Sequence, residues 1–465
     1  MDERTIPSSG VVDVTEVSAW ARRVGSAGDA LGAVPAGVEE CRAEAAACVD
    51  LIAALETLTA AAAGLQARLA VRLDDATRTV QAAEGLAPAR LGQGVASQVG
   101  LARCESPNKG AVLLGAAKTW VREMPATLAC LESGRLNEWR AMIVARETAC
   151  LSVEDRAAVD ARIPGLLAEH PGMGNRALEA AVKREAYRLD AQSYVHRADK
   201  AAKDRRVTCR PTAEGMVYLT ALLPLRAGVG VYAALRREAD AARAGGDPLG
   251  RGQLMADLLV SRVTGRPADD PADVHLDVVI SDAALLAETD EPAQVSGVGT
   301  VPAAWVRALV GRLDPASQEA VAVRRLYAAP GRLVAAESSG RFFSPGLADL
   351  IRARDQRCRT PWCDAPIRHT DHVVDHAAGG PTALANGQGL CERCNHTKAL
   401  PGWSARAGGG PCAEVTTATP TGHRYVSTPP PGPVTERAGP VTSTGSGDRL
   451  VAGLLPARLA GDRCG

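Results

Sequence analysis

Through the N-terminal half of the chain, apolar residues recur three and four positions apart, which is the spacing of one helix face. Residues 38–76, rich in Ala, Leu, Glu and Arg, predict one long helix. Ser106 and Pro107 form a favourable N-cap and first-turn pair for a helix towards Val121. Ser152, with an acidic residue three positions later, opens a further helix. This pattern predicts a mainly α-helical fold.

Prolines and glycines mark the predicted ends of these helices. Gly134 indicates a turn before a helix over 137–148. Pro164, Pro171 and Gly172 are predicted to be further helix boundaries. The helical part is therefore predicted to consist of several helices joined by turns.

After Arg205 the pattern changes to short runs of β-branched and alternating residues. Helices such as 229–244 are predicted to lie between these strands. The predicted strands are Arg206–Arg210, Met216–Thr220, Leu276–Ile280 and Arg332–Ala336. This part is predicted to be a small α+β segment of the same N-terminal domain.

The chain is predicted to divide into five parts. They are a partly flexible segment 1–37, a helical domain 38–204, a mixed α/β part 205–345, a small module 346–407 and a tail 408–465. From Gly408 onwards the chain is rich in Gly, Pro, Thr and Ser, a composition typical of disorder. We therefore expect a mostly disordered tail, with one short strand near Tyr425.

Composition narrows the classes of partner. The chain has 465 residues and a formal net charge of +0, so no overall basic field attracts nucleic acid. Any DNA affinity must come from local patches. Met1 is followed by charged residues, and no uninterrupted apolar stretch of membrane length stands out. The sequence predicts a cytoplasmic protein without a membrane partner.

Four cysteines near the C-terminus are spaced as two close pairs. Cys358 and Cys363 form a C-x4-C pair, and Cys391 and Cys394 form a C-x2-C pair. This pattern suits a tetrahedral zinc ion, because each short loop places two sulfurs on one side of the metal. The segment is too small to bury much apolar surface, so structural zinc would supply much of its stability. The alternatives are disulfides, which do not fit a cytoplasmic protein, or separate core cysteines.

Polar residues capable of metal binding and proton transfer lie between and after these pairs. Asp371 and His372 are on a predicted strand, followed by a Gly-Gly-Pro turn, Asn386, Asn395 and Lys398. Strict strand alternation would place Asp371 and His372 on opposite faces, so the strand must end or twist at this pair. We expect the strand to face two short helices, which begin near the two asparagines.

This order of residues resembles that of an HNH endonuclease module. The family pattern is a DH pair, a Gly-Gly turn, an Asn, then C-x-x-C followed by His or Asn and a Lys. The resemblance implies a zinc-stapled ββα-metal fold that hydrolyses phosphodiester bonds in DNA with a divalent cation, Mg²⁺ or Mn²⁺. Three other segments, 135–151, 205–224 and 420–425, resemble an actinobacterial group in which a helical domain of unknown function precedes this module.

The resemblance also implies a role for each residue of the pattern. His372 would be the general base, since an imidazole near neutral pKa accepts a proton from water. Asp371 and Asn395 would hold the catalytic cation. Asn386 would orient His372 through its amide. Lys398 would contact a phosphate as a point charge.

Two positions depart from the common family pattern. Asp375 stands where the family usually has Pro, and Asn395 stands where it often has His. The amide oxygen is a weaker ligand than imidazole but suits a hard cation. His396 could serve as a ligand beside Asn395. His369 and His376 are interpreted as ordinary surface or packing histidines.

Two further features could bind duplex DNA. Residues 95–121 have the proportions of a helix-turn-helix, whose second helix carries Lys109, Lys118 and Arg122. A basic patch precedes the first predicted strand, although a solvated helix end explains it equally well. Its members are Arg197, Lys200, Lys203, Arg205, Arg206 and Arg210.

Three functions fit these observations. The first is an HNH endonuclease, which the joint presence of Asp371, His372, Asn386 and Lys398 favours. The second is a catalytically impaired DNA-binding or regulatory protein, which Asp375 and Asn395 favour. The third is a zinc-stabilised protein-interaction module. A double-strand cutter would need two sites and hence a dimer, but we recognise no heptad seam that predicts one.

Overall fold

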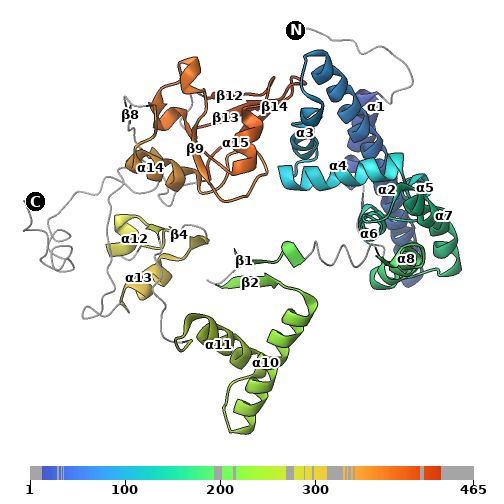
Figure 1. Ribbon diagram of the computed structural model, residues 1–465, viewed down its shortest axis with the longest axis horizontal. Helices are drawn as coiled ribbons and strands as arrows, with labels where there is room; N and C mark the ends of the chain where they lie inside the picture. The colour runs from blue at the N-terminus through green and yellow to red at the C-terminus, as the bar shows by residue number, and fades with distance from the viewer. Residues whose placement is uncertain are drawn as a thin grey trace, which may run out of the picture.

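The computed structural model describes most of the chain between residues 13 and 430. The residues outside this description are 1–12, 29–30, 33, 35, 193–201, 213–215, 269–276, 287–288, 296–297, 312–327, 330–331, 334–336, 339–340, 409–412 and 431–465. The predictions for the start of the flexible N-terminal segment, for Arg197 and Lys200 of the basic patch, and for most of the tail lie outside the described residues. In the described part helices predominate and strands form small sheets, as the sequence predicts (Figure 1).

The N-terminal part is a layered helical domain. Its helices are α1 (Val14–Ala27), α2 (Val38–Ala83), η2 (Pro88–Arg90), α3 (Val95–Ala102), α4 (Pro107–Arg122), α5 (Pro125–Glu132), α6 (Glu138–Glu147), α7 (Val153–Glu169) and α8 (Asn175–Leu189). The C-terminal half of α2 packs on α4 and α5, burying Ala60, Ala63, Ala67 and Val71. Trp120 of α4 lies in the core, and its Nε1 donates to the carbonyl of Ala141 at 3.2 Å. The domain core thus lies along one end of a single long helix.

Two predicted helix starts are confirmed by their caps, and one predicted boundary is wrong. The Ser106 hydroxyl accepts from Lys109 N at 3.2 Å, and the Ser152 hydroxyl accepts from Asp155 N at 3.0 Å. Pro164, however, lies inside α7 rather than at its end. Ile163 and Leu166 are both buried, so packing against the core keeps the helix continuous through the proline.

One described helix is long and apolar enough to span a membrane by length and composition. It is α2, in which an 18-residue window reaches a mean hydropathy of 1.6. Charged residues such as Asp50 and Glu56 interrupt α2, so it does not contradict the expectation of no uninterrupted apolar stretch of membrane length. Only 6% of that window is buried.

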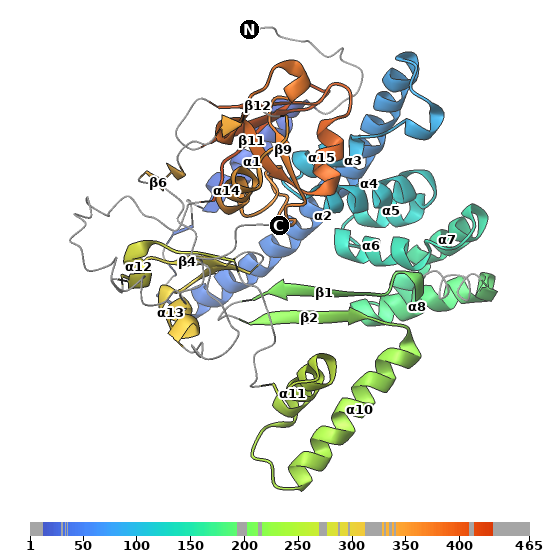
Figure 2. The ribbon, with the colours of Figure 1, turned by 60° about the vertical axis from the view of Figure 1, so that its left-hand side comes forward.

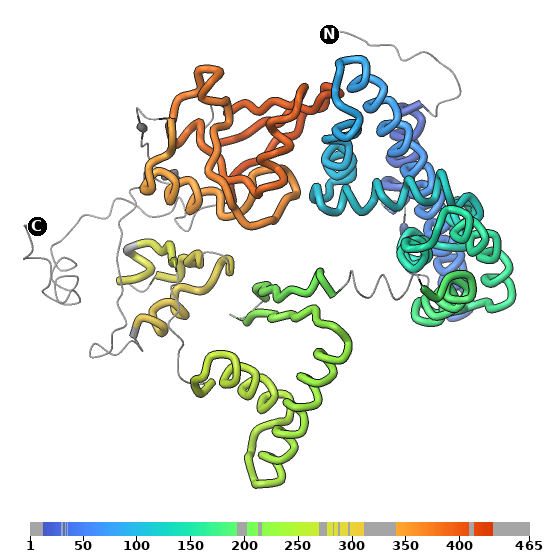
Figure 3. Tube along the Cα trace, in the orientation of Figure 1, coloured from blue at the N-terminus to red at the C-terminus, as the bar shows by residue number. Residues whose placement is uncertain are grey.

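In its described residues the middle part contains three separate small sheets, and its trace forms the green to yellow segments of the tube in Figure 3. Strands β1 (Arg206–Pro211) and β2 (Val217–Leu222) form an antiparallel hairpin, which agrees with the prediction. Helices α10 (Leu225–Ala244) and α11 (Arg251–Thr264) follow. The remaining elements are β3 (Val278–Val279), α12 (Asp282–Leu286), β4 (Ala293–Val295), β5 (Gly299–Val301), α13 (Ala303–Gly311), β6 (Ala328–Ala329) and β7 (Arg332–Leu333). Strands β3 and β7 begin within predicted runs but are shorter, and parts of both runs lie outside the described residues.

The C-terminal module is built from short strands and helices. Its elements are β8 (Glu337–Ser338), α14 (Pro345–Asp355), β9 (His369–His372), η4 (His376–Ala378), β10 (Thr382–Ala383), η5 (Leu384–Asn386), β11 (Gly387–Leu390) and α15 (Glu392–Lys398). Strand β9 pairs antiparallel with β11, with Asp371 opposite Gln388 and His372 opposite Gly387. The strand ends at His372, as the alternation argument requires for that residue and Asp371 to serve one site.

The module extends beyond its predicted boundary at residue 407. Strands β12 (Ser404–Ala407), β13 (Val415–Ala418) and β14 (Arg424–Ser427) form an antiparallel sheet. Buried Arg359 donates to the carbonyls of Ala413 and Ser427 at 2.9 and 2.8 Å. The prediction of a mostly disordered tail from residue 408 is therefore wrong for 413–430, although the strand predicted near Tyr425 is present as β14.

Candidate functional site

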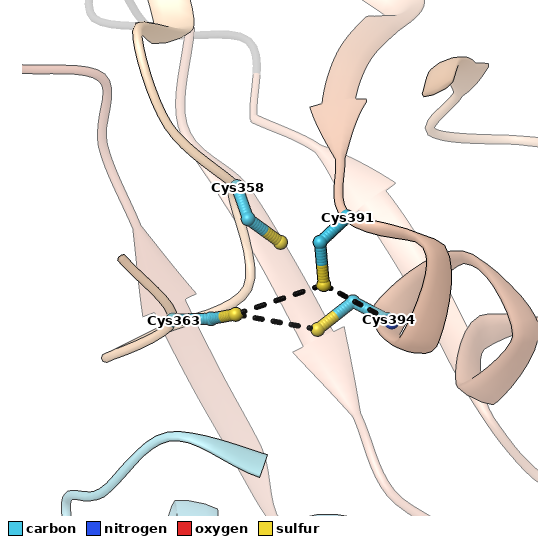
Figure 4. Close-up of side chains that lie close together, drawn as sticks. All are labelled: Cys358, Cys363, Cys391 and Cys394. Atoms are coloured by element: carbon cyan, nitrogen blue, oxygen red, sulfur yellow. Dashed lines mark hydrogen bonds between the residues drawn. The ribbon is translucent and has the colours of Figure 1, made fainter. Parts of the chain in front are cut away.

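Four thiols meet at one point, and they come from the two predicted pairs (Figure 4). Cys358 and Cys363 lie on the loop after α14, Cys391 is the N-cap of α15, and Cys394 lies in its first turn. All four are buried, and their sulfurs lie within 4.8 Å of one another. The sequence prediction that these four residues could hold one metal ion is confirmed at the level of geometry.

The sulfur separations fit a zinc ion and exclude disulfides. Sγ of Cys363 is 3.8 Å from Sγ of Cys391 and 3.6 Å from Sγ of Cys394. A disulfide requires about 2.05 Å. Four sulfurs arranged tetrahedrally around zinc at about 2.3 Å lie about 3.8 Å apart. The cluster is therefore a site for a structural metal such as zinc.

The crowding of the thiols also explains why a cation is needed there. Hydrogen bonds from Cys358, Cys363 and Cys394 lower the pKa of Cys391. Hydrogen bonds with Cys358, Cys363 and Cys391 raise the pKa of Cys394. One thiolate is thus stabilised while further ionisation is opposed by the first negative charge. A divalent cation would allow all four sulfurs to carry the charge that metal binding requires.

His372 ends β9 and is buried beside the strand. Its Nε2 lies 2.9 Å from Oγ1 of Thr382, and its ring is 4.4 Å from that of Phe343 between centroids. Thr382 donates its own proton to the carbonyl of Arg341 at 3.5 Å. In the tautomer with the proton on Nε2, Thr382 accepts from His372 and Nδ1 keeps a lone pair for a proton. Burial lowers the pKa of His372, so its neutral, proton-accepting form is favoured.

The ammonium of Lys398 links α15 to the acidic side of this strand. Nζ lies 2.7 Å from Oδ2 of Asp371 and 2.6 Å from Oδ1 of Asp375. It also donates to the carbonyl of His372. Its three donors are thus directed at acceptors of its own chain, whereas the sequence analysis assigned Lys398 to phosphate. The lysine occupies a position between two carboxylates that attracts a cation.

Asn386 holds a loop rather than the imidazole. Its Oδ1 accepts from Val374 N at 2.9 Å, and its Nδ2 donates to the carbonyls of Val374 and Pro381 at 3.0 and 2.9 Å. The described hydrogen bond of the His372 imidazole is with Thr382, so the predicted direct orientation of His372 by Asn386 is wrong. A side chain at Gly380 would collide with Val374 and Asn386, which explains the second glycine of the turn.

Replacing Asn386 with Ala removes all three of these hydrogen bonds. Because the partners are backbone groups of a partly buried loop, we expect the module to lose about 1–3 kcal/mol of stability. Hydrogen exchange in 374–381 should accelerate, and calorimetry should show the lower unfolding temperature. His369→Ala, at the exposed start of β9, is the matched control and should leave both measurements unchanged. Unaltered exchange in the Asn386 variant would contradict this role.

The other proposed cation ligands lie on α15. Asn395 is three residues before Lys398, so it shares the helix face that approaches Asp371. Asn395 is half-buried, and His396 is exposed on the neighbouring face. Asp375 contacts the same lysine as Asp371. The ring centroids of His376 and His372 lie 5.7 Å apart, so His376 is a packing partner of the His372 ring.

The predicted helix-turn-helix is present as α3 and α4, but its second helix is not free. Lys118 pairs with buried Asp74 at 2.8 Å, and Arg122 pairs with Asp75 at 2.5 Å. Asn108, in the first turn of α4, accepts a hydrogen bond from Arg393 of α15. The end of α4 that would enter a DNA groove thus faces the C-terminal module (Figure 2).

Further contacts join the helical domain to the same module. Ser97 Oγ lies 3.3 Å from Thr397 Oγ1, and Thr421 donates to Gln98 at 3.0 Å. Residues of α3 therefore contact both α15 and the loop between β13 and β14. The basic residues Lys203, Arg205, Arg206 and Arg210 that the structure describes are exposed near β1.

Several residues that shape the site were missed in the sequence. Thr382 and Phe343 hold the His372 ring, and Asp355 and Arg359 connect the cysteine loop to β11 and β14. Asp355 accepts from Gly389 N at 2.7 Å and pairs with Arg354 at 2.7 Å. In the sequence, the only indication of the Asp355 and Arg359 contacts is a group of charged residues within a segment whose other residues pack as a core. That signal does not distinguish buried from exposed charges.

Two relatives of this chain are the uncharacterized proteins MT2160 and Rv2100 of Mycobacterium tuberculosis. Each is 31% identical to it over 202 residues. The alignment covers 42% of this chain and 32% of each relative, so the chain spans about a third of the relatives' length. No family model matches the chain, and no solved structure does.

Proposed function

We propose that this protein is a metal-dependent HNH-type endonuclease that hydrolyses phosphodiester bonds in duplex DNA. The observation that carries the proposal is a buried neutral imidazole, His372, placed beside the Asp371 carboxylate on a strand next to a four-cysteine staple. This combination exceeds what a structural zinc module needs. The C-terminal fold is accordingly interpreted as a zinc-stapled ββα-metal module.

Each residue of the site has a role in this mechanism. His372 accepts the proton of the attacking water, because burial keeps the imidazole neutral. Thr382 fixes the ring, and Asn386 fixes the loop that closes over it. Asp371 and Asn395 offer the hard oxygen donors that Mg²⁺ or Mn²⁺ prefers. When bound, such a cation stabilises negative charge on the phosphate and the leaving oxygen.

The position of Lys398 favours a second candidate, a DNA-binding protein with impaired cleavage. Its single ammonium pairs with both Asp371 and Asp375, so the three groups together keep one negative charge. Asp371 would have to exchange its contact with Lys398 to hold a divalent cation, and Lys398 would then be able to reach a phosphate. The two candidate functions therefore differ in whether a divalent cation or Lys398 is bound by the Asp371 carboxylate.

A plasmid-nicking assay with Mg²⁺ or Mn²⁺ tests the proposal. We expect the native protein to nick supercoiled DNA and His372→Ala to do so at least about 10²-fold more slowly, because general-base catalysis is lost. His369→Ala, on the same strand and exposed, is the control and should keep full activity. If native protein and His372→Ala both shift DNA on a gel without nicking it, the second candidate is correct. Failure to bind DNA at all would refute both.

A further inference from the structure

The hairpin of β1 and β2 has two chemically different faces. In the described residues these two strands form a sheet of their own, with a continuous antiparallel register (Figures 1 and 2). Side chains alternate along each strand, and opposite residues point to the same side, so the register assigns every residue to a face. One face has Val207, Cys209, Pro211, Val217, Leu219 and Ala221, and the other has Arg206, Thr208, Arg210, Tyr218, Thr220 and Leu222. The first is apolar throughout, whereas all residues of the second except Leu222 can form side-chain hydrogen bonds. We call the second the polar face.

The polar face is open to solvent, and its charges are free. All of its residues are exposed, Tyr218 by 62%. Among the residues that the structure describes, Arg206 donates to the carbonyl of Asp204 at 3.3 Å, and neither Arg206 nor Arg210 pairs with a carboxylate. Both guanidinium groups are therefore available to an anion from outside the chain.

The basic residues of α4 differ in this respect. Lys118 pairs with buried Asp74, and Arg122 pairs with Asp75. Such a pair must be broken before its cation can bind a phosphate, and breaking a pair with a buried carboxylate is costly. The hairpin is therefore better suited to bind a polyanion than the predicted helix-turn-helix.

The dimensions of the hairpin fit the major groove of duplex DNA. That groove is about 12 Å wide and admits a two-stranded ribbon, whose strands lie about 4.8 Å apart. Arg206 and Arg210 are separated by about 14 Å along β1, since a strand rises about 3.4 Å per residue. Their guanidinium groups can thus reach phosphates that border the groove. Thr208 lies between them, and Thr220 is its partner in the register.

We propose that the polar face of the β1–β2 hairpin binds the major groove of duplex DNA. Arg206 and Arg210 bind phosphates at the edges of the groove, and Thr208, Thr220 and Tyr218 face the base edges. This inference rests on the proposed function, because it gives the DNA-cleaving site a separate surface that holds the substrate. A local patch of this kind lets a chain with a net charge of +0 bind a polyanion.

DNA affinity measured without a divalent cation separates this surface from the cleavage site. Fluorescence anisotropy of a labelled short duplex should show that native protein binds and that its affinity falls with added salt. Combining Arg206→Gln with Arg210→Gln should weaken binding about 10- to 100-fold at about 0.1 M salt and reduce the slope of log K against log salt by about 1.8, because two phosphate contacts are lost. Combining Arg237→Gln with Arg243→Gln removes the same charge from exposed positions on α10 and should bind like native protein.

Ligands that occupy one groove of DNA test where the hairpin binds. Methyl green, which occupies the major groove, should displace the native protein, whereas netropsin, which occupies the minor groove, should not. An unlabelled single strand of the same length should compete weakly. Thr208→Ala combined with Thr220→Ala should keep the native salt slope but weaken binding to duplexes selected by native protein, because these side chains contact bases rather than phosphates.

Each outcome decides between the inference and its alternatives. Arg206→Lys combined with Arg210→Lys keeps both charges and should keep the native salt slope, and circular dichroism verifies that every variant is folded. Equal affinity of native protein and the Arg206→Gln, Arg210→Gln variant would overturn the inference. Displacement by netropsin, or a single strand that binds as tightly as the duplex, would also overturn it.

Failure of this inference is distinguishable from failure of the proposed function. A native protein that nicks plasmid DNA but binds it independently of the hairpin would refute only the inference. A native protein that binds duplex DNA through the hairpin, yet does not nick it with Mg²⁺ or Mn²⁺, would refute only cleavage. Neither binding nor nicking would refute both.

Discussion

Replacing Cys391 with Ser is expected to unfold the C-terminal module and release its metal. Cys391 is both a member of the four-sulfur cluster and the N-cap of α15, where its sulfur accepts from Cys394 N at 3.5 Å. Structural zinc contributes about 10–16 kcal/mol at comparable sites. That amount equals or exceeds the whole stability of a small domain, which is about 5–15 kcal/mol. No single change outside the four cysteines, in the described part of the chain, should cost as much.

The small apolar core of this module explains the dependence on metal. Around the cysteines, Leu390 is the one buried residue other than the ligands, with Ala365 partly buried beside it. A second small cluster holds Leu347, Ile351 and Leu384. Such cores cannot offset the conformational entropy of ordering the module. A metal ion held by the four cysteines would therefore take the place of a larger hydrophobic interior.

Metal content and proteolysis measure this effect together. Native protein should carry one zinc per chain, and Cys391→Ser should carry almost none and be cleaved rapidly within 358–398. Cys209→Ser, an exposed position on β1, is the matched control and should keep zinc and protection. A Cys391→Ser protein that stays protected without zinc would show that the sulfurs are merely packed together.

Replacing Asp355 with Ala is expected to destabilise the module by about 3–5 kcal/mol. Asp355 is 1% exposed and pairs with Arg354 at 2.7 Å and Arg359 at 3.4 Å. Burial lowers the pKa of Arg359, and the Asp355 carboxylate counteracts that effect. Removing the carboxylate leaves two guanidinium groups near the interior and Gly389 N without its acceptor. The cost arises mainly from this uncompensated charge.

Calorimetric unfolding of the zinc-loaded protein checks the size of this loss. Asp349→Ala is the control, because Asp349 pairs with Arg352 on the exposed side of the same helix at 3.2 Å. Exposed pairs contribute about 0–1 kcal/mol, so the control should unfold close to the native temperature. Equal effects of the two substitutions would mean that the Asp355 cluster is accessible to water. Zinc content should stay unchanged in both variants.

Local sequence signals predicted the parts of the site that depend on short-range chemistry. The two cysteine pairs needed only loops of fixed length, and Ser106 and Ser152 needed only the first turn of their helices. The end of β9 at His372 followed from the two-residue period of a strand. In each case the partners lie within a few residues, so the spacing determines the geometry.

The features that sequence reasoning missed depend on contacts between distant segments. Arg359 meets Ser427, and Lys398 meets Asp371 and Asp375, only after the strands have paired. Pro164 stays inside a helix because of a core that the local sequence does not reveal. Residue type alone does not determine which of several acceptors a long side chain binds.

The link between Arg359 and the last sheet decides where the C-terminal module could be separated from the rest of the protein. A fragment ending at residue 407 would carry all four cysteines, His372 and Lys398, yet it would strip two carbonyl acceptors from a guanidinium that is 4% exposed. The smallest transplantable unit therefore reaches to about residue 430. Fusions and truncations that end at residue 407, directly after the sequence motif, would divide the unit. Those that extend to about residue 430 would keep the acceptors of the buried Arg359 and leave the unit whole.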